Sequence, residues 1–136
     1  MKLITRDTDY ALRALCFIAK RKGEIVSVAE LAAALNLPRP FLRKLLQTLN
    51  REGLLKSTKG RGGGFQLAQP AEKLYLLNLI KIFQGPLQLN ECLLKKLPCP
   101  SAKTCKLKNK VDRIQNFALS ELKNVTLEYL IKERGG

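Results

Sequence analysis

The chain has 136 residues, 46% of them hydrophobic, and its 25 Lys and Arg against 11 Asp and Glu give a formal net charge of +14. This composition excludes a disordered chain and suits one compact domain or a small domain with an appendage, and the absence of a run of about 18 apolar residues excludes a membrane-spanning helix. Residues 1–70 carry 13 basic and 5 acidic side chains and residues 71–136 carry 12 and 6, so the folded surface is basic throughout. We expect a polyanionic partner, with nucleic acid ahead of anionic membrane.

The first predicted element is a helix over residues 8–21, where apolar side chains recur at three- and four-residue spacing. Thr8 or Asp7 is the expected cap at its start, and Gly23 follows its end. Cys16 lies on the apolar stripe of this helix, and we interpret it as a small buried hydrophobe.

A pair of helices comes next. Ser27 and Glu30 form a capping box for a short helix that runs through Leu35, and after a break a second helix is predicted over residues 39–52. This order is typical of a helix-turn-helix, although an ordinary amphipathic pair with a solvated charged face gives the same pattern. The candidate DNA contacts are the basic and polar residues off the apolar stripe of the second helix, with the proline of its first turn: Arg39, Pro40, Arg43, Lys44, Gln47 and Arg51.

Two short strands are then predicted, over residues 54–59 and 65–68, joined by Gly-Arg-Gly-Gly-Gly. Glycines permit close approach of the backbone to a ligand, so a hairpin of this kind is a wing that can reach a phosphate backbone or a minor groove. Its candidate DNA contacts are Lys59, Gly60, Arg61 and Gly62. The loop lacks the GxxxxGK motif of nucleotide-binding loops and does not run from a strand into a helix.

For residues 76–131 the sequence pattern predicts helices on both sides of a loop. Residues 76–83 are apolar and predict a short strand that enters a helix, and residues 86–105 predict a loop. A long amphipathic helix over residues 106–123 is a natural dimer element; the alternative is packing on the first helix within the chain, and both are compatible if they use different faces. Thr126 is the expected cap of a last short helix, residues 127–131.

We therefore expect a mainly α fold with a small β-hairpin wing. The chain divides into a winged helix-turn-helix DNA-binding domain over residues 1–84, a cysteine-bearing loop over residues 85–105, and a dimerisation helix with a C-terminal segment over residues 106–136.

Three cysteines lie within 14 residues of this loop: Cys92, Cys99 and Cys105. Thiolates gathered on a short loop can hold an iron–sulfur cluster or a zinc ion, but three are one short of the usual four ligands and the chain contains no histidine. The first residues have no secretory hydrophobic region, so we expect a cytoplasmic protein with reduced thiols and read the cysteines as metal or redox groups before disulfides.

Several segments of the sequence together resemble a known protein family. Residues 8–15, the wing residues 60–68, the three spaced cysteines before a long helix, and residues 124–127 are similar to the Rrf2 family of bacterial transcription regulators. The resemblance implies a homodimer with winged helix-turn-helix heads and a crossed pair of long helices. It also implies that Cys92, Cys99 and Cys105 hold an iron–sulfur cluster, 2Fe–2S or 4Fe–4S, whose state alters the binding of double-stranded operator DNA.

The resemblance also bears on the missing fourth ligand. Members that regulate cluster assembly have a histidine three residues after the last cysteine, where this chain has Lys108, whose ammonium has no free lone pair. Nitric-oxide-sensing members use an acidic residue of the first helix, from the partner subunit, and the matching position is Asp9. Glu91, Asp7, a solvent or small-thiol ligand, and an incomplete site remain open. Arg43 stands where cluster-assembly regulators have a glutamate, so we expect a different operator.

Three other functions stay open beside a cluster-controlled regulator. The first is a cluster-free regulator of the same fold that uses cysteine thiols or a partner protein as its signal, and the second is a zinc-binding DNA-binding module. The third is an enzyme, which we do not expect, because the chain has no histidine, no nucleophile elbow and no phosphate-binding loop.

Overall fold

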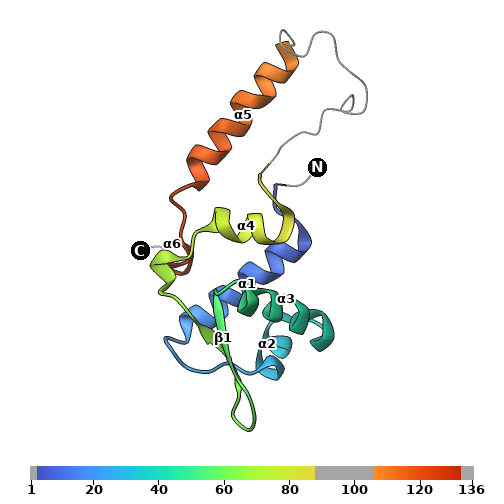
Figure 1. The fold of residues 1–136 in the computed structure, drawn as a ribbon, viewed down its shortest axis with the longest axis vertical. Helices are drawn as coiled ribbons and strands as arrows, with labels where there is room; N and C mark the ends of the chain where they lie inside the picture. The colour runs from blue at the N-terminus through green and yellow to red at the C-terminus, as the bar shows by residue number, and fades with distance from the viewer. Residues whose placement is uncertain (1–2, 88–105, 133–136) are drawn as a thin grey trace.

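The computed structural model describes residues 3–87 and 106–132, which form a helical body with one small hairpin and one projecting helix (Figure 1). α1 lies at the centre of the body, where it contacts α2, α3, α4, α6 and β2. The expected fold class, mainly α with a hairpin wing, is confirmed. In chain order the elements are α1 (Arg6–Lys20), α2 (Val28–Leu35), α3 (Arg39–Arg51), β1 (Leu55–Thr58), β2 (Gly64–Leu67), the 3-10 helix η1 (Ala71–Lys73), α4 (Leu76–Gln84), α5 (Lys106–Leu122) and α6 (Leu127–Ile131).

α1 begins two residues earlier than predicted, and its cap is a different residue. The hydroxyl of Thr5 accepts a hydrogen bond from the backbone N–H of Thr8, 3.5 Å away, so neither Thr8 nor Asp7 caps this helix. Thr8 lies inside α1 and is fully buried, and its hydroxyl donates to Oε1 of Gln84 at 2.8 Å. Short polar residues near a helix start are interchangeable as caps in sequence, and here the contact with α4 decides between them.

The helix-turn-helix is formed as predicted. The hydroxyl of Ser27 accepts from the backbone N–H of Glu30 at 3.1 Å, which is one half of the expected capping box. Asn36, directly after α2, adopts a left-handed conformation with φ of 54°, which asparagine tolerates better than most residues. This conformation ends α2 and turns the chain, so that α3 starts only three residues later.

The wing is a two-stranded antiparallel hairpin in which Leu55 pairs with Leu67 and Thr58 with Gly64. A third segment joins it, because Val26 and Phe65 exchange two backbone hydrogen bonds of 2.9 and 2.8 Å. A Cβ on Gly64 would lie 2.2 Å from the carbonyl oxygen of Val26, so only glycine allows this approach. The wing is therefore fastened to the segment that leads into α2.

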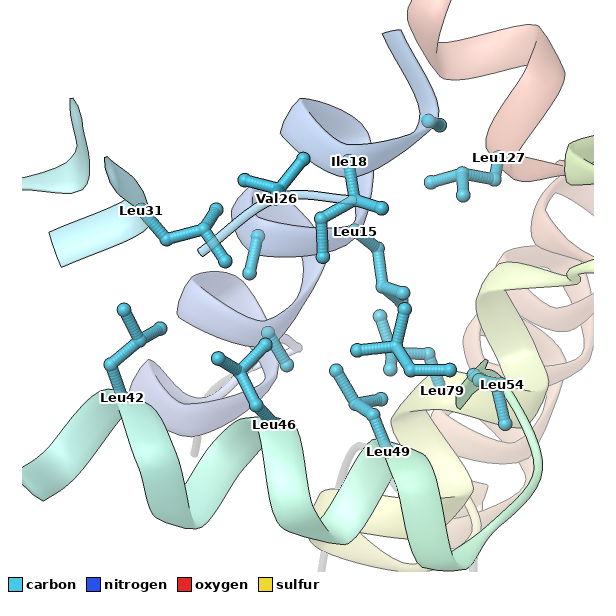
Figure 2. Close-up of a cluster of buried hydrophobic side chains, with 14 of the residues drawn as sticks. Leu15, Ile18, Val26, Leu31, Leu42, Leu46, Leu49, Leu54, Leu79 and Leu127 are labelled. Atoms are coloured by element: carbon cyan, nitrogen blue, oxygen red, sulfur yellow. The ribbon is translucent and has the colours of Figure 1, made fainter. Parts of the chain in front are cut away.

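The core lies between α1 and α3 and extends to α4 and α6 (Figure 2). Leu42, Leu46 and Leu49 of α3 point toward Leu15 and Ile18 of α1, and all five are at most 2% exposed. Burial of a leucine or isoleucine side chain stabilises a fold by roughly 1.5–3 kcal/mol. This packing fixes α3 on α1 through its apolar face and leaves its polar face free.

The prediction for residues 76–83 is wrong in part. The segment is helical from Leu76 to Gln84, without a strand at its start. Strand-like pairing occurs just before it, at an isolated bridge between Tyr75 and Thr126, supported by a hydrogen bond of 2.8 Å from the backbone N–H of Leu127 to the carbonyl of Leu74. A short apolar run does not distinguish a strand from a buried helix, and the pairing partner lies about fifty residues away in sequence.

α5 projects from the body and extends away from α1, and none of its residues is buried (Figure 1). The alternative in which its stripe packs on the first helix is therefore wrong. Leu107, Ile114 and Phe117 are 69%, 59% and 66% exposed. After α5, the hydroxyl of Thr126 accepts from the backbone N–H of Tyr129 at 3.1 Å, which confirms the predicted cap of α6. In residues 3–87 and 106–132, no helix is long and apolar enough to cross a bilayer.

Candidate nucleic-acid interface

α3 separates its residues into an apolar and a basic face. Leu42, Leu45, Leu46 and Leu49 are buried, as expected for apolar positions at three- and four-residue spacing. All six residues of α3 that the sequence singled out as candidate DNA contacts are exposed: Arg39, Pro40, Arg43, Lys44, Gln47 and Arg51.

A groove of about 630 Å³ separates α3 from the wing. Residues 57–60 and 63–65 of the hairpin form one wall, and the start of α2 closes one part of it. The groove brings together five of the predicted contact residues and leaves the other five, Pro40, Lys44, Arg51, Arg61 and Gly62, outside its lining. The predicted residues that line it are Arg39, Arg43, Gln47, Lys59 and Gly60.

Asn50 and Ser57 also line this groove, and neither was predicted. Asn50 lies seven residues after Arg43 and three after Gln47, so the helical spacing carried the signal for it. Ser57 lies two residues before Lys59 in the predicted strand, so strand alternation placed both on one face and carried the signal for it. Both side chains can donate and accept hydrogen bonds, which suits contacts with bases and phosphates.

The tip of the wing is a tight turn with left-handed glycines. Gly60 and Gly62 have φ of 92° and 71°, and the backbone N–H of Gly63 donates to the carbonyl of Gly60 at 3.0 Å. Lys59 and Arg61 are exposed, and neither belongs to an ion pair within the described part of the chain. Since no acidic residue lines the groove, its charge is positive and it suits an anionic backbone.

Aromatic rings join the first turn of α3 to α1. The rings of Tyr10 and Phe41 are perpendicular, with centroids 5.8 Å apart. The guanidinium of Arg6 lies 5.2 Å from the centre of the Phe41 ring, and that of Arg13 lies 6.0 Å from the centre of the Tyr10 ring. Edge-to-face pairs stabilise a contact by about 0.5–1.5 kcal/mol beyond area burial. This cluster therefore positions the start of α3, where Arg39 is presented.

Of the four candidate metal ligands, the described residues include only Asp9. Cys92, Cys99 and Cys105 lie outside the described residues, as does the alternative ligand Glu91. Asp9 lies in the first turn of α1, where its carboxylate is 43% exposed and accepts from Nε of Arg13 at 3.3 Å. In the described ranges, no three His, Cys, Asp or Glu side chains are grouped so that they could hold a metal ion.

Asp7, an alternative fourth ligand, and Lys108, at the position of the family's histidine, each have a charged partner. The carboxylate of Asp7 lies 3.5 Å from Nε of Arg6, and the ammonium of Lys108 lies 3.5 Å from the carboxylate of Asp112. The Lys108 side chain therefore lies beside an acidic side chain of its own helix, at the position where cluster-assembly regulators have a histidine.

The end of α4 is fastened to the start of α1. The side chain of Gln84 accepts from the backbone N–H of Thr5 at 2.9 Å and donates to the carbonyl of Leu3 at 3.1 Å. The first described part of the chain thus ends at residue 87, near the first turn of α1. The second begins at Lys106, at the end of α5 far from the body (Figure 1).

Cys16, the cysteine outside that segment, is half-buried rather than fully buried, and it packs against the core. Burial raises the pKa of its thiol, while the nearby Lys20 ammonium acts in the opposite direction. The thiol form is therefore favoured at neutral pH, as expected of a mainly structural cysteine.

Comparison with known proteins agrees with this geometry. A family described as Rrf2, iron-dependent transcriptional regulator, matches residues 4–133. A protein of Aquifex aeolicus, named provisionally as an HTH-type transcriptional regulator, is 32% identical over 95% of this chain and 92% of its own length.

Solved structures show the same fold. That of CymR, named the global cysteine regulator of B. subtilis, has a TM-score of 0.81 and 27% identity, and the match covers 96% of this chain and 97% of that one. The structure of T. potens IscR has a TM-score of 0.72 and 20% identity, covering 99% and 94% of the two chains, and at this identity it shows the fold alone.

Proposed function

The chain belongs to the Rrf2 family of transcriptional regulators, and from this premise we propose that it binds operator DNA as a homodimer under the control of an iron–sulfur cluster. It is a DNA-binding regulator and not an enzyme, as expected from the sequence. The observation that carries the DNA-binding part is the basic groove between α3 and the wing.

On this proposal, α3 enters the major groove and the wing follows the backbone. Arg39, Arg43 and Gln47 point from one face of α3, and arginine pairs best with the two acceptors of guanine or with phosphate. Lys59 lines the same groove, and Arg61 extends from the wing tip beside it, within reach of phosphates or a minor groove. The α3 contacts then select the sequence, and the wing contacts contribute affinity.

Replacing Lys59 and Arg61 together by alanine is expected to weaken operator binding and to flatten its salt dependence. Each lost phosphate contact lowers the slope of log affinity against log salt by about 0.9, so the double variant should lose up to about 1.8. The measurement is a DNA titration at several salt concentrations. Lys73→Ala with Lys123→Ala removes the same charge away from the groove and should leave the slope nearly unchanged; equal slopes in both double variants mean that the wing does not touch DNA.

The donor set supports the cluster part of the proposal. Cys92, Cys99 and Cys105 provide three thiolates, the preferred ligands of iron–sulfur clusters, and a partly exposed Asp9 carboxylate would complete a set of four. A carboxylate is the harder and more labile ligand, so its iron would be the open corner. When bound, the cluster supplies a group whose oxidation state and integrity change with oxygen, nitric oxide or iron supply.

The placement of α5 supports a fourth ligand from the partner subunit. Cys105 directly precedes α5, a helix of 17 residues that is roughly 25 Å long. Asp9 lies in the body, which α5 leaves at its other end (Figure 1). If two α5 helices cross as antiparallel partners, the first turn of α1 in one protomer approaches the cysteine-bearing end of α5 in the other, and cluster loss would alter the spacing of the two α3 helices.

Anaerobic purification tests this function. We expect a brown protein with visible charge-transfer absorbance, stoichiometric iron and sulfide, and an operator footprint that differs between the cluster-bound and apo forms. A colourless protein that takes up no iron on reconstitution would favour the cluster-free alternative, which the similarity to a cysteine regulator keeps in view. Bound zinc in place of iron would instead identify the zinc-binding module.

A further inference from the structure

A second groove, of about 380 Å³, runs along the outer face of α1, and none of its lining residues lines the groove between α3 and the wing. Leu12, Cys16 and Phe17 form its floor. Leu35, the last residue of α2, forms one wall and Leu130 of α6 forms the other.

The floor of this groove is an extension of the core that faces water. Leu12, Cys16, Phe17 and Leu35 pack against the buried cluster and yet remain partly exposed, and Leu130 is 39% exposed. Beside it on α6, Tyr129 is 67% exposed. Apolar surface gathered in a concave strip, and not scattered singly, marks a site of association.

Two cations stand at the ends of the strip. Arg13 and Lys20 both line the groove, and their separation of seven residues on α1 corresponds to about two helical turns, or roughly 10 Å. Arg13 is shared with Asp9, whereas Lys20 belongs to none of the ion pairs in the described part of the chain. No acidic residue lines the groove, so its charge complements an acidic occupant.

We propose that this α1 groove docks an amphipathic helix of a partner protein, in which an apolar stripe is flanked by acidic side chains about two turns apart. A small molecule is a poorer fit, because the groove is open along its length and would leave much of such a ligand in water. A helix laid along α1 covers Leu12 and Cys16, which lie one turn apart, and meets Arg13 and Lys20 near its two ends. Because Leu35 adjoins the helix-turn-helix turn, the docked helix contacts the DNA-binding domain without occupying the α3–wing groove.

The experiment uses the full-length protein and a designed 18-residue helical peptide with leucines at positions i, i+4, i+7 and i+11 and glutamates on both flanks. Binding is measured by fluorescence anisotropy against a peptide with the same leucines and lysine for every glutamate. We expect the acidic peptide to bind, and Lys20→Glu to weaken its binding about five- to ten-fold, since a favourable charge becomes a repulsive one. Lys73→Glu, which makes the same charge change away from the groove, should leave binding nearly unchanged.

A second measurement reports on the groove directly. Alkylation of Cys16, followed by mass spectrometry of its peptide in the full chain, should be slow but measurable and should be slowed further by the acidic peptide. Equal binding of both peptides, or no effect of Lys20→Glu, overturns the proposal. The proposal is also overturned if the Cys16 thiol of the oligomeric protein is not alkylated in the absence of peptide. That result would mean that a second copy of the chain already covers the groove. The assay contains no DNA and no metal, so its failure leaves the proposed function untouched.

Discussion

A protein with Ile114→Glu and Phe117→Glu will sediment as a monomer and will lose operator affinity by about a hundred-fold or more. The two side chains are 59% and 66% exposed on a helix that buries none of its own residues. Burial of each of these side chains in a two-fold interface stabilises the dimer by roughly 1.5–3 kcal/mol, and each is buried once in either protomer. Buried glutamates reverse that gain.

The loss of DNA affinity follows because a monomer has only one DNA-binding domain. When two α3 helices are joined, the second half-site is bound at a high effective concentration, which increases affinity by about 10²–10⁴-fold over one head alone. The variant should therefore bind a full palindromic site and an isolated half-site with similar affinity. The wild-type protein should prefer the full site strongly.

A matched control separates this effect from the added charge. Asn109→Glu with Asn116→Glu introduces the same two carboxylates into the same helix, but on exposed polar positions away from the apolar stripe. This variant should remain dimeric and should lose affinity only through the weaker general attraction to DNA. A dimeric Ile114→Glu, Phe117→Glu protein would mean that α5 is not the dimer contact.

The helix-turn-helix was predictable because its signals are local. The capping box of Ser27 and Glu30, the leucine spacing of α3 and the glycine run of the wing each lie within one element or one turn. The errors involve pairs that are distant in the sequence. Thr5 caps α1 because Thr8 is engaged by Gln84, 76 residues away, and α4 lacks its predicted strand because the strand-like pairing of Tyr75 is with a residue beyond α5.

The candidate site divides in the same way. Helical periodicity identified the exposed side chains of α3 and, through its spacing, also contained the signal for Asn50. These α3 side chains share one groove with Ser57 and Lys59 because the hairpin folds back toward α3 and Gly64 lies close to Val26. Helical periodicity does not encode either of these tertiary contacts. The roles of the three cysteines and of Asp9 rest on donor chemistry and resemblance, and they stay predictions.

The second large effect is expected at the cluster ligands. Cys99→Ser should abolish the visible absorbance of the anaerobically purified protein, because a thiolate ligand is lost. Asp9→Ala should leave a cluster that forms but decays about 10–100-fold faster in air or on exposure to nitric oxide, a loss of the size that even outer ligand contacts produce. The free energy of unfolding of the apo-protein should change by no more than about 1 kcal/mol, because the Asp9 and Arg13 side chains that form the ion pair are 43% and 62% exposed.

Two further variants identify which property of Asp9 matters. Arg13→Ala removes the ion pair but keeps the carboxylate, and Asp7→Ala removes the other acidic residue of the first turn of α1, which has the same favourable interaction with the helix dipole. If Asp9 is the fourth ligand, the Asp7→Ala cluster decays at the wild-type rate, and the Arg13→Ala cluster decays more slowly than that of Asp9→Ala, because Arg13→Ala removes only a contact to the ligand. If Arg13→Ala reproduces the fast decay, the ion pair positions α1 and the ligand is another residue. If Asp9→Ala itself matches wild type in spectrum and lifetime, the open corner of the cluster is held by Glu91 or by a ligand from solution.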